Sequence, residues 1–190
     1  HDIERLIEEI DLPLNLEMAA TKEMLDIAIK HKPNACCIVP EKRQEVTTEG
    51  GLNLNANIDK LSDCIDKLKG NAIRVSLFID PQKKDIEIAK ELGADIVEIH
   101  TGSFANNFNK NGEIHSDEFD HLNNVSIFAH EIGLEVHAGH GLAFETARAI
   151  SRINVLKELN IGHFIIGEAV FEGLDCVIKK FRAILNSERS

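Results

Sequence analysis

Two residues suited to proton transfer lie at or near the ends of short apolar runs in this chain. Glu17 lies in the run Leu14–Met18, and His140 lies in the His-Ala-Gly-His-Gly stretch of residues 137–141. A carboxylate in a half-closed site is suited to accept a proton, and an imidazole accepts or donates one near neutral pH. A structural ion pair with Arg74 is the alternative for Glu17, and a lone histidine is often only structural. Both residues are candidates for acid–base catalysis.

Glycines near the C-terminal end of the chain favour an anion site. Gly141, Gly162 and Gly167 lie beside the last two predicted strands, and glycine allows a ligand to approach the backbone closely. Backbone N–H groups at a helix N-terminus bind phosphate without any side-chain charge. The glycines therefore predict a local phosphate site in a chain whose formal net charge is −11.

A long polar segment, residues 39–54, follows the second predicted strand. It is longer than the usual connection of about 2–6 residues, and long connections have a function more often than short ones do. The segment contains basic residues, hydroxyl groups and a glycine pair: Lys42, Arg43, Thr47, Thr48 and Gly50–Gly51. These residues offer charge, hydrogen bonds and a hinge to a ligand. A solvated charged loop is the simpler interpretation by residue type, and both interpretations stay open.

The metal-ligating residue types lack the spacing of a metal site. His137 and His140 would converge only if the chain bent at Gly139, and a zinc site needs further ligands. The cysteines show no paired C-x-x-C spacing: Cys36, Cys37, Cys64 and Cys176. Cys36 and Cys37 should point to opposite faces of a strand. We expect no metal, and free buried thiols in a reducing cytosol.

Short apolar runs alternate with helical patterns along the whole chain. The six candidate strands are Leu14–Met18, Ala35–Val39, Ile73–Ile79, Ile96–His100, Leu134–His137 and Phe164–Ile166, and none of them contains lysine. Apolar residues between the second and third strands have the spacing of an amphipathic helix that Gly70 ends. This alternation predicts βαβ units and a parallel sheet.

Polar pairs within the strands distinguish a barrel from an open doubly wound sheet. Residues two apart share one strand face, and three such pairs are polar: Asn15 and Glu17, Glu98 and His100, Glu135 and His137. Strands covered on both faces would be apolar, so a polar lumen fits better. We predict an α/β fold, a (β/α)8 TIM barrel forming one domain over residues 1–190. Such barrels take about 250 residues, so we expect the first two strands to be absent from this sequence.

The composition excludes several classes of function. Acidic residues outnumber basic ones by 32 to 21, and there is no Trp or Tyr, which argues against general nucleic-acid binding. No apolar run approaches the length of about 20 residues that spans a bilayer. The visible N-terminus lacks an export signal. We expect a cytoplasmic protein that binds neither nucleic acid nor membrane.

Six motifs occur in an order that closely resembles the pyridoxine 5′-phosphate synthase family: NLEMAATKEML, CCIVPEKRQEVTTEGGL, VSLFID, EIHTG, AGHGL and NIGHFIIGEAVFEGL. The resemblance implies a (β/α)8 barrel with extra helices, assembled as a homo-octamer. It implies that 1-deoxy-D-xylulose 5-phosphate condenses with 3-amino-2-oxopropyl phosphate to give pyridoxine 5′-phosphate, phosphate and water. It also implies that no metal or organic cofactor is needed, and that two further strands with active-site residues precede His1.

The resemblance also assigns roles to single residues. It implies that Glu17 is the proton acceptor and His140 the proton donor. Thr47 would contact the deoxyxylulose phosphate. The aminoketone phosphate would contact Gly141, Gly162 and His163. Two other functions stay open: a phosphate-handling barrel aldolase or isomerase, and a non-catalytic sensor of phosphorylated ligands on the same fold.

Overall fold

The computed structural model describes residues 1–41, 50–56, 58–111 and 116–188. The chain divides into two compact units, His1–Glu98 (unit 1) and Ile99–Ser190 (unit 2). A single domain over residues 1–190 stays a prediction.

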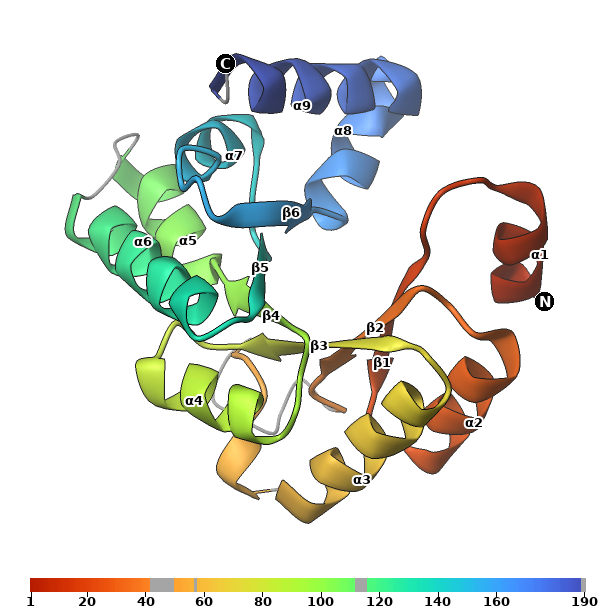
Figure 1. The fold of residues 1–190 in the computed structure, drawn as a ribbon. Helices are drawn as coiled ribbons and strands as arrows, with labels where there is room; N and C mark the ends of the chain where they lie inside the picture. Colours follow the sequence, from red (N-terminus) through yellow and green to blue (C-terminus); the bar gives the residue numbers. More distant parts are fainter. Residues whose placement is uncertain (42–49, 57, 112–115, 189–190) are drawn as a thin grey trace. The chain divides into compact units, whose positions relative to one another are not determined.

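Unit 1 alternates strands with helices from its first residues onward (Figure 1). Its elements are α1 (Asp2–Glu9), β1 (Asn15–Ala19), α2 (Lys22–His31), β2 (Ala35–Val39), the 3-10 helix η1 (Leu54–Ala56), α3 (Ile58–Gly70), β3 (Arg74–Ile79), α4 (Lys83–Glu91) and the start of β4 (Ile96–His100). β1, β2 and β3 pair in parallel. β4 begins beside β3, because the Asp95 N–H donates to the Val75 carbonyl at 3.0 Å.

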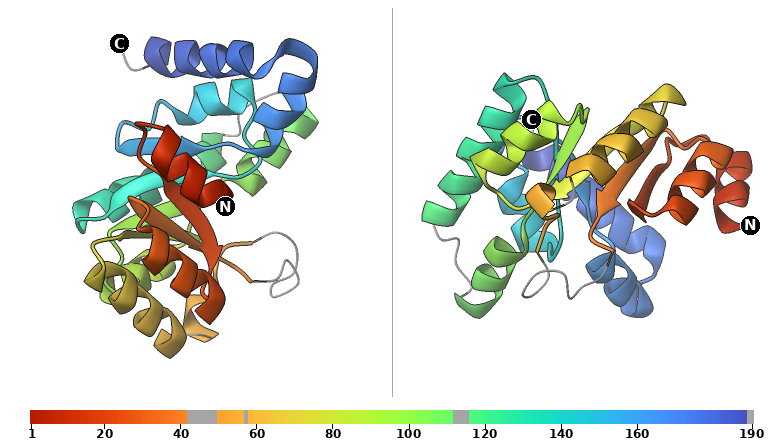
Figure 2. Two further views of the ribbon diagram at one scale, coloured as in Figure 1. Left: turned by 90° about the vertical axis from the view of Figure 1, so that its right-hand side faces the viewer. Right: turned by 90° about the horizontal axis from the view of Figure 1, so that it is seen from below.

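Two helices of unit 1 show why they form: α2 has a capped start, and α3 has an apolar face. The Thr21 hydroxyl accepts a hydrogen bond from the Met24 N–H at 3.3 Å and so begins α2. In α3 the residues spaced for one helix face are buried: Leu61, Cys64, Ile65 and Leu68. The helices α2 and α3 cover the same face of the strands (Figures 1 and 2). The opposite strand face is therefore left for the polar residues.

Unit 2 continues the same alternation. Its elements are the end of β4, α5 (Gly102–Asn111), α6 (Ser116–Glu131), β5 (Glu135–Gly139), α7 (Phe144–Ile150), β6 (Leu156–Asn160), α8 (His163–Glu172) and α9 (Leu174–Glu188). β5 pairs in parallel with β6, with an irregular register between Val136 and His137. The end of β4 lies beside β5, because the Thr101 N–H donates to the Gly139 carbonyl at 2.8 Å.

The predicted strand Phe164–Ile166 is wrong, because these residues lie in α8. Short apolar runs do not distinguish a strand from a helix, and here packing decides. The Phe164 ring contacts Phe144 of α7 and Phe181 of α9, with centroids 5.0 and 6.0 Å apart. The strand Leu156–Asn160 was not predicted, because its exposed Lys157 and Glu158 interrupt the apolar pattern expected of a buried strand.

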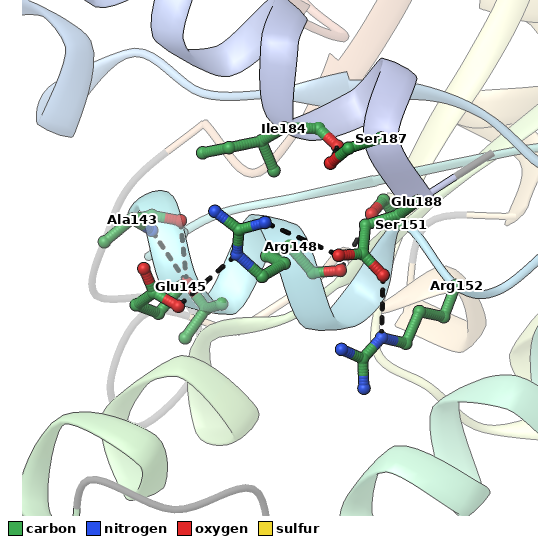
Figure 3. A network of polar contacts seen from close by, with 9 residues as sticks. Ala143, Glu145, Arg148, Ser151, Arg152, Ile184, Ser187 and Glu188 are labelled. Atoms are coloured by element: carbon green, nitrogen blue, oxygen red, sulfur yellow. Dashed lines mark hydrogen bonds and ion pairs between the residues drawn. The ribbon is translucent and has the colours of Figure 1, made fainter. Parts of the chain in front are cut away.

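Polar contacts add to this apolar packing between α7 and α9 (Figure 3). The Glu188 carboxylate accepts hydrogen bonds from Arg148 at 3.5 Å and from Arg152 at 3.1 Å. These bonds lower the pKa of Glu188, and the bond from Arg152 has the larger effect. The chain turns sharply between α8 and α9 at Gly173, whose φ is 84° (Figures 1 and 2). Within the described ranges, no helix is both long and apolar enough to cross a membrane.

Candidate functional site

One face of the strands in unit 1 presents a row of polar side chains. The parallel register places Glu17 of β1 opposite Cys37 of β2, and Cys37 opposite Ser76 of β3. Residues in register on neighbouring strands project to the same face. The Cys37 thiol donates to the Glu98 carboxylate of β4 at 3.2 Å, which extends the row by one strand. Glu17 is exposed, whereas Glu98 is only 7% exposed.

The two adjacent cysteines of β2 occupy different environments, as predicted. Burial, followed by the nearby Glu98 charge, raises the pKa of the Cys37 thiol, so this thiol is a neutral donor and not a nucleophile. Burial and the nearby Cys64 of α3 raise the pKa of Cys36 to about 12. Cys37 therefore faces the polar row and Cys36 faces the helices.

The end of the segment that follows β2 is packed against the end of β3. The Gly51 N–H donates to the Asp80 carboxylate at 2.9 Å. A Cβ at Gly51 would lie 2.5 Å from the Asp80 nitrogen and 2.7 Å from the Ile79 Cα. Close backbone approach, and not a hinge, is thus the reason for glycine here. Thr47, the predicted substrate contact, lies outside the described residues.

The second candidate group, His140, lies one residue past the end of β5 in unit 2. Its backbone φ is 80°, and Gly141 follows with a φ of 77°. A non-glycine residue in this region costs of order 1–3 kcal/mol and persists only where the surroundings hold it, often at functional sites. The His140 side chain is exposed, and its ring centroid lies 4.9 Å from that of His100. His140 is thus held beyond the strand, where a ligand can reach it.

Two of the three glycines predicted to bind phosphate, Gly141 and Gly162, follow the same sheet edge as His140, whereas Gly167 lies inside α8. Gly139, the last residue of β5, is in register with Asn160, the last residue of β6. The segments that follow, His140–Gly141 and Gly162–His163, therefore leave the same edge of the sheet. Gly162 precedes α8, and its carbonyl accepts the Ile166 N–H at 3.1 Å. Four of the six predicted site residues lie here, while Glu17 belongs to unit 1.

His137 does not join His140 in this group. It is buried, with its Nε2 atom 2.9 Å from a Glu135 carboxylate oxygen and its Nδ1 atom 3.5 Å from one of Glu158. In the part of the chain that the structure describes, no three His, Cys, Asp or Glu residues form a group that could hold a metal ion. His137 is therefore a buried partner of two carboxylates.

Sequence reasoning missed several residues around these groups. Glu98 and His100 were recognised only as polar strand residues, and Thr101 was not singled out. These residues are adjacent in the sequence, in the Glu-Ile-His-Thr-Gly run that ends β4 and begins α5, and this run could have identified them. Thr101 is buried, and a Cβ at Gly102 would lie 2.7 Å from the His100 ring. Their partners lie far away in the chain, which sequence spacing does not reveal.

Solved structures of low sequence identity share this fold. Citrate synthase SbnG aligns with a TM-score of 0.57 at 12% identity, over 98% of this chain and 78% of that chain. The HpcH/HpaI aldolase from Desulfitobacterium hafniense DCB-2 aligns with a TM-score of 0.55 at 11% identity, over 92% and 73%. Together with the alternating parallel strands and helices, these likenesses confirm the predicted α/β fold of a partial (β/α) barrel.

Sequence comparison identifies the family. The chain is 48% identical over 189 residues to pyridoxine 5′-phosphate synthase of Zymomonas mobilis, covering 100% of this chain and 73% of the relative. It is 50% identical over 190 residues to the enzyme of the same name from Xanthobacter autotrophicus, covering 100% and 74%. Residues 1–187 match the family model described as "Pyridoxal phosphate biosynthesis protein PdxJ". The predicted resemblance is confirmed: the chain belongs to this family of vitamin B6 biosynthetic enzymes.

Proposed function

We propose that the protein is a pyridoxine 5′-phosphate synthase that condenses 1-deoxy-D-xylulose 5-phosphate with 3-amino-2-oxopropyl phosphate. The products are pyridoxine 5′-phosphate, phosphate and water. Two relatives of this name, 48% and 50% identical to the chain, support the assignment. The observation that supports it most directly is the left-handed turn at His140, with φ 80°, at a sheet edge shared with Gly162 and His163.

In this proposal, His140 donates and Glu17 accepts the protons of the condensation. The amine of one substrate and the ketone of the other form an imine with each other, so no enzyme lysine is needed. Both proposed groups are exposed, His140 beyond the end of β5 and Glu17 on β1. Each side chain is therefore accessible to a ligand on its own unit, which a proton-transfer role requires.

The aminoketone phosphate is assigned to Gly141, Gly162 and His163. Two of these residues lie at the N-terminus of α8, where backbone N–H groups and the helix dipole favour an anion. Such a site needs no net positive charge, in agreement with a formal charge of −11. The contact of Thr47 with the deoxyxylulose phosphate and the homo-octameric assembly stay predictions from the family resemblance.

One observation favours a lysine-dependent aldolase as the alternative. None of the predicted strands contained lysine, but the true last strand, β6, contains Lys157, which is exposed. A barrel enzyme that forms an imine with its own lysine needs a strand lysine, and Lys157 would become nucleophilic on desolvation by a bound substrate. Borohydride would then trap a covalent adduct between Lys157 and a substrate ketone.

The test is to mix the complete purified protein with both phosphorylated substrates and to follow pyridoxine 5′-phosphate by its fluorescence. We expect product, and no protein–substrate adduct after borohydride treatment. Binding of either substrate without product would indicate the sensor. A trapped adduct that Lys157→Arg abolishes would indicate the aldolase. Either result would contradict the synthase proposal.

A further inference from the structure

The residue that follows β4 is hydrogen-bonded to the turn that carries His140. The Thr101 hydroxyl lies 2.7 Å from the Gly139 carbonyl oxygen and 2.8 Å from that of His140. A hydroxyl has one hydrogen to donate, so the two contacts share it as a three-centre bond. The Thr101 N–H also donates to the Gly139 carbonyl, at 2.8 Å. Both donors of this buried residue, 1% exposed, are thus used on one turn.

These contacts fix the backbone on both sides of His140. The Gly139 carbonyl belongs to the peptide plane before the His140 Cα, and the His140 carbonyl belongs to the plane after it. The orientation of these two planes sets φ and ψ, and with them the direction of the Cβ. The φ of His140 is 80°, a conformation that persists only where the surroundings hold it. The Thr101 hydroxyl is therefore placed to set the direction of the imidazole.

One edge of the imidazole packs closely against the start of α5. A Cβ at Gly102 would lie 2.7 Å from the His100 Nε2 atom and 3.1 Å from the His140 Cδ2 atom. A Cβ at Gly141 would lie 3.1 Å from the Ala105 Cβ. The His100 and His140 rings are tilted by 50° with centroids 4.9 Å apart. The start of α5 and the turn after β5 thus fit together only because glycine occupies both positions.

We propose that Thr101 is a positioning residue for His140: its shared hydroxyl hydrogen bond holds the left-handed turn in the orientation that presents the imidazole to the substrate. Thr101 acts through His140 and need not touch the substrate. The inference rests on the proposed function, in which His140 is the proton donor. It extends that function by naming the group that maintains the geometry.

The first test replaces the hydroxyl by a methyl group of similar size, Thr101→Val. A small displacement of an acid–base group is sufficient to lower kcat by about 10–100-fold. We expect a kcat loss in that range, with KM for both substrates within about threefold of wild type, since phosphate binding does not need the hydroxyl. Thr101→Ser retains the hydroxyl and should restore kcat to within about threefold.

A matched variant separates positioning from stability. The hydroxyl of Thr146, also buried in unit 2, accepts the Ala143 N–H at 2.7 Å and contacts the Ala143 carbonyl at 3.2 Å at the start of α7. Thr146→Val removes an equivalent hydroxyl and should lower Tm without lowering kcat. Equal kcat losses in Thr101→Val and Thr146→Val would overturn the positioning role.

The protonation of His140 gives a second measurement, which should not change if Thr101 only stabilises the fold. The His140 ring resonance is assigned by its loss in His140→Asn and is titrated by NMR in the free protein. We expect a different titration midpoint in Thr101→Val, and a matching shift of the pH profile of kcat. Thr146→Val should leave both unchanged. A wild-type kcat and titration in Thr101→Val would overturn the proposal.

Two comparisons keep the test decisive. If Thr101→Val does not fold, Thr101→Ser and Thr101→Ala isolate the hydroxyl, and equal kcat values in this pair would overturn the proposal. Full activity in His140→Asn would instead contradict the proposed role of His140. An inactive His140→Asn beside a fully active Thr101→Val would overturn only the positioning of His140 by Thr101.

Discussion

The carboxylates of unit 1 and the imidazole of unit 2 are held in place by different physical means. Glu17 and Glu98 project from regular parallel strands, where the ladder register determines the face on which a side chain lies. His140 lies past its strand, with a backbone φ of 80°, and hydrogen bonds from Thr101 hold the turn. Strand residues thus obtain their direction from repeating structure, whereas the turn residue depends on individual tertiary contacts.

The largest expected effect comes from removing either proposed acid–base group. Glu17→Gln and His140→Asn should each lower kcat by about 10²–10⁴-fold, the usual contribution of general acid–base catalysis. The fluorescence assay of pyridoxine 5′-phosphate described above measures this loss of kcat. Glu87→Gln on α4 and His130→Asn on α6 change exposed residues of the same types and serve as controls. Full turnover in either test variant would remove that residue from the mechanism.

Gly51, at the end of the polar segment in unit 1, is packed as closely as the glycines around the His140 turn in unit 2. An added side chain at Gly51 should therefore destabilise the fold. Gly51→Ala places a Cβ within 2.7 Å of backbone atoms of Ile79 and Asp80. Overpacking of this kind costs about 1–3 kcal/mol in unfolding free energy, which urea denaturation measures. At Gly70, by contrast, a Cβ meets no atom within 4 Å. Equal losses in Gly51→Ala and Gly70→Ala would contradict this explanation.

The buried thiol on the helix-facing side of β2 should make stability depend on alkaline pH. Burial raises the pKa of Cys36 from 9.0 to about 12. Below pH 9 both states keep the proton and the stability is fully present. Above it the unfolded chain alone loses the proton, so stability falls until the folded thiol ionises near 12.

Denaturant titrations between pH 8 and pH 10.5, a range of about 2.5 pH units, measure this loss of stability. The unfolding constant should rise by up to about tenfold per pH unit above pH 9. Cys36→Ala should make the decline shallower without abolishing it, because burial also raises the pKa of Cys37. Its stability at neutral pH should be lower because of the cavity. Cys176→Ala, at an exposed position, should keep the wild-type slope. An equal slope in all three proteins would show that Cys36 keeps its ordinary pKa.

The smallest effect is expected for the partly exposed ion pairs of Glu188 in α9 with Arg148 and Arg152, in contrast to the buried Thr101 contact. Hydrogen bonds from Arg152 and then Arg148 lower the pKa of Glu188 below 4.5. Their stabilisation is present above that pH and is lost as the pH falls through the lowered pKa. Glu188→Gln should lower Tm by about 1–2 °C at neutral pH.

Thermal unfolding by circular dichroism checks the Glu188 prediction, with Glu131→Gln on α6 as an exposed control. The difference between wild type and Glu188→Gln should disappear in acid, where the carboxylate is protonated. A difference that persists there would mean that Glu188 acts through packing instead of charge.

The alternation of strands and helices was predictable, because apolar runs and glycine stops are local signals. Two strands, Ala35–Val39 and Ile96–His100, have the predicted bounds. The prediction failed at Phe164, where an apolar run forms a helix because its ring packs against α7 and α9. It also failed at Leu156–Asn160, a strand whose exposed charges conceal it.

In the candidate site, too, some features could be predicted from the sequence and others depend on the tertiary structure. The sequence by itself determined the α/β class, the family, and the polar residues Glu17 and His140, because residue type and strand alternation are written locally. Only the tertiary structure decided that Thr101 reaches a turn 38 residues further along the chain. It also decided that Cys37 faces Glu98, 61 residues away. Such contacts depend on which strands lie side by side, and local patterns do not contain that information.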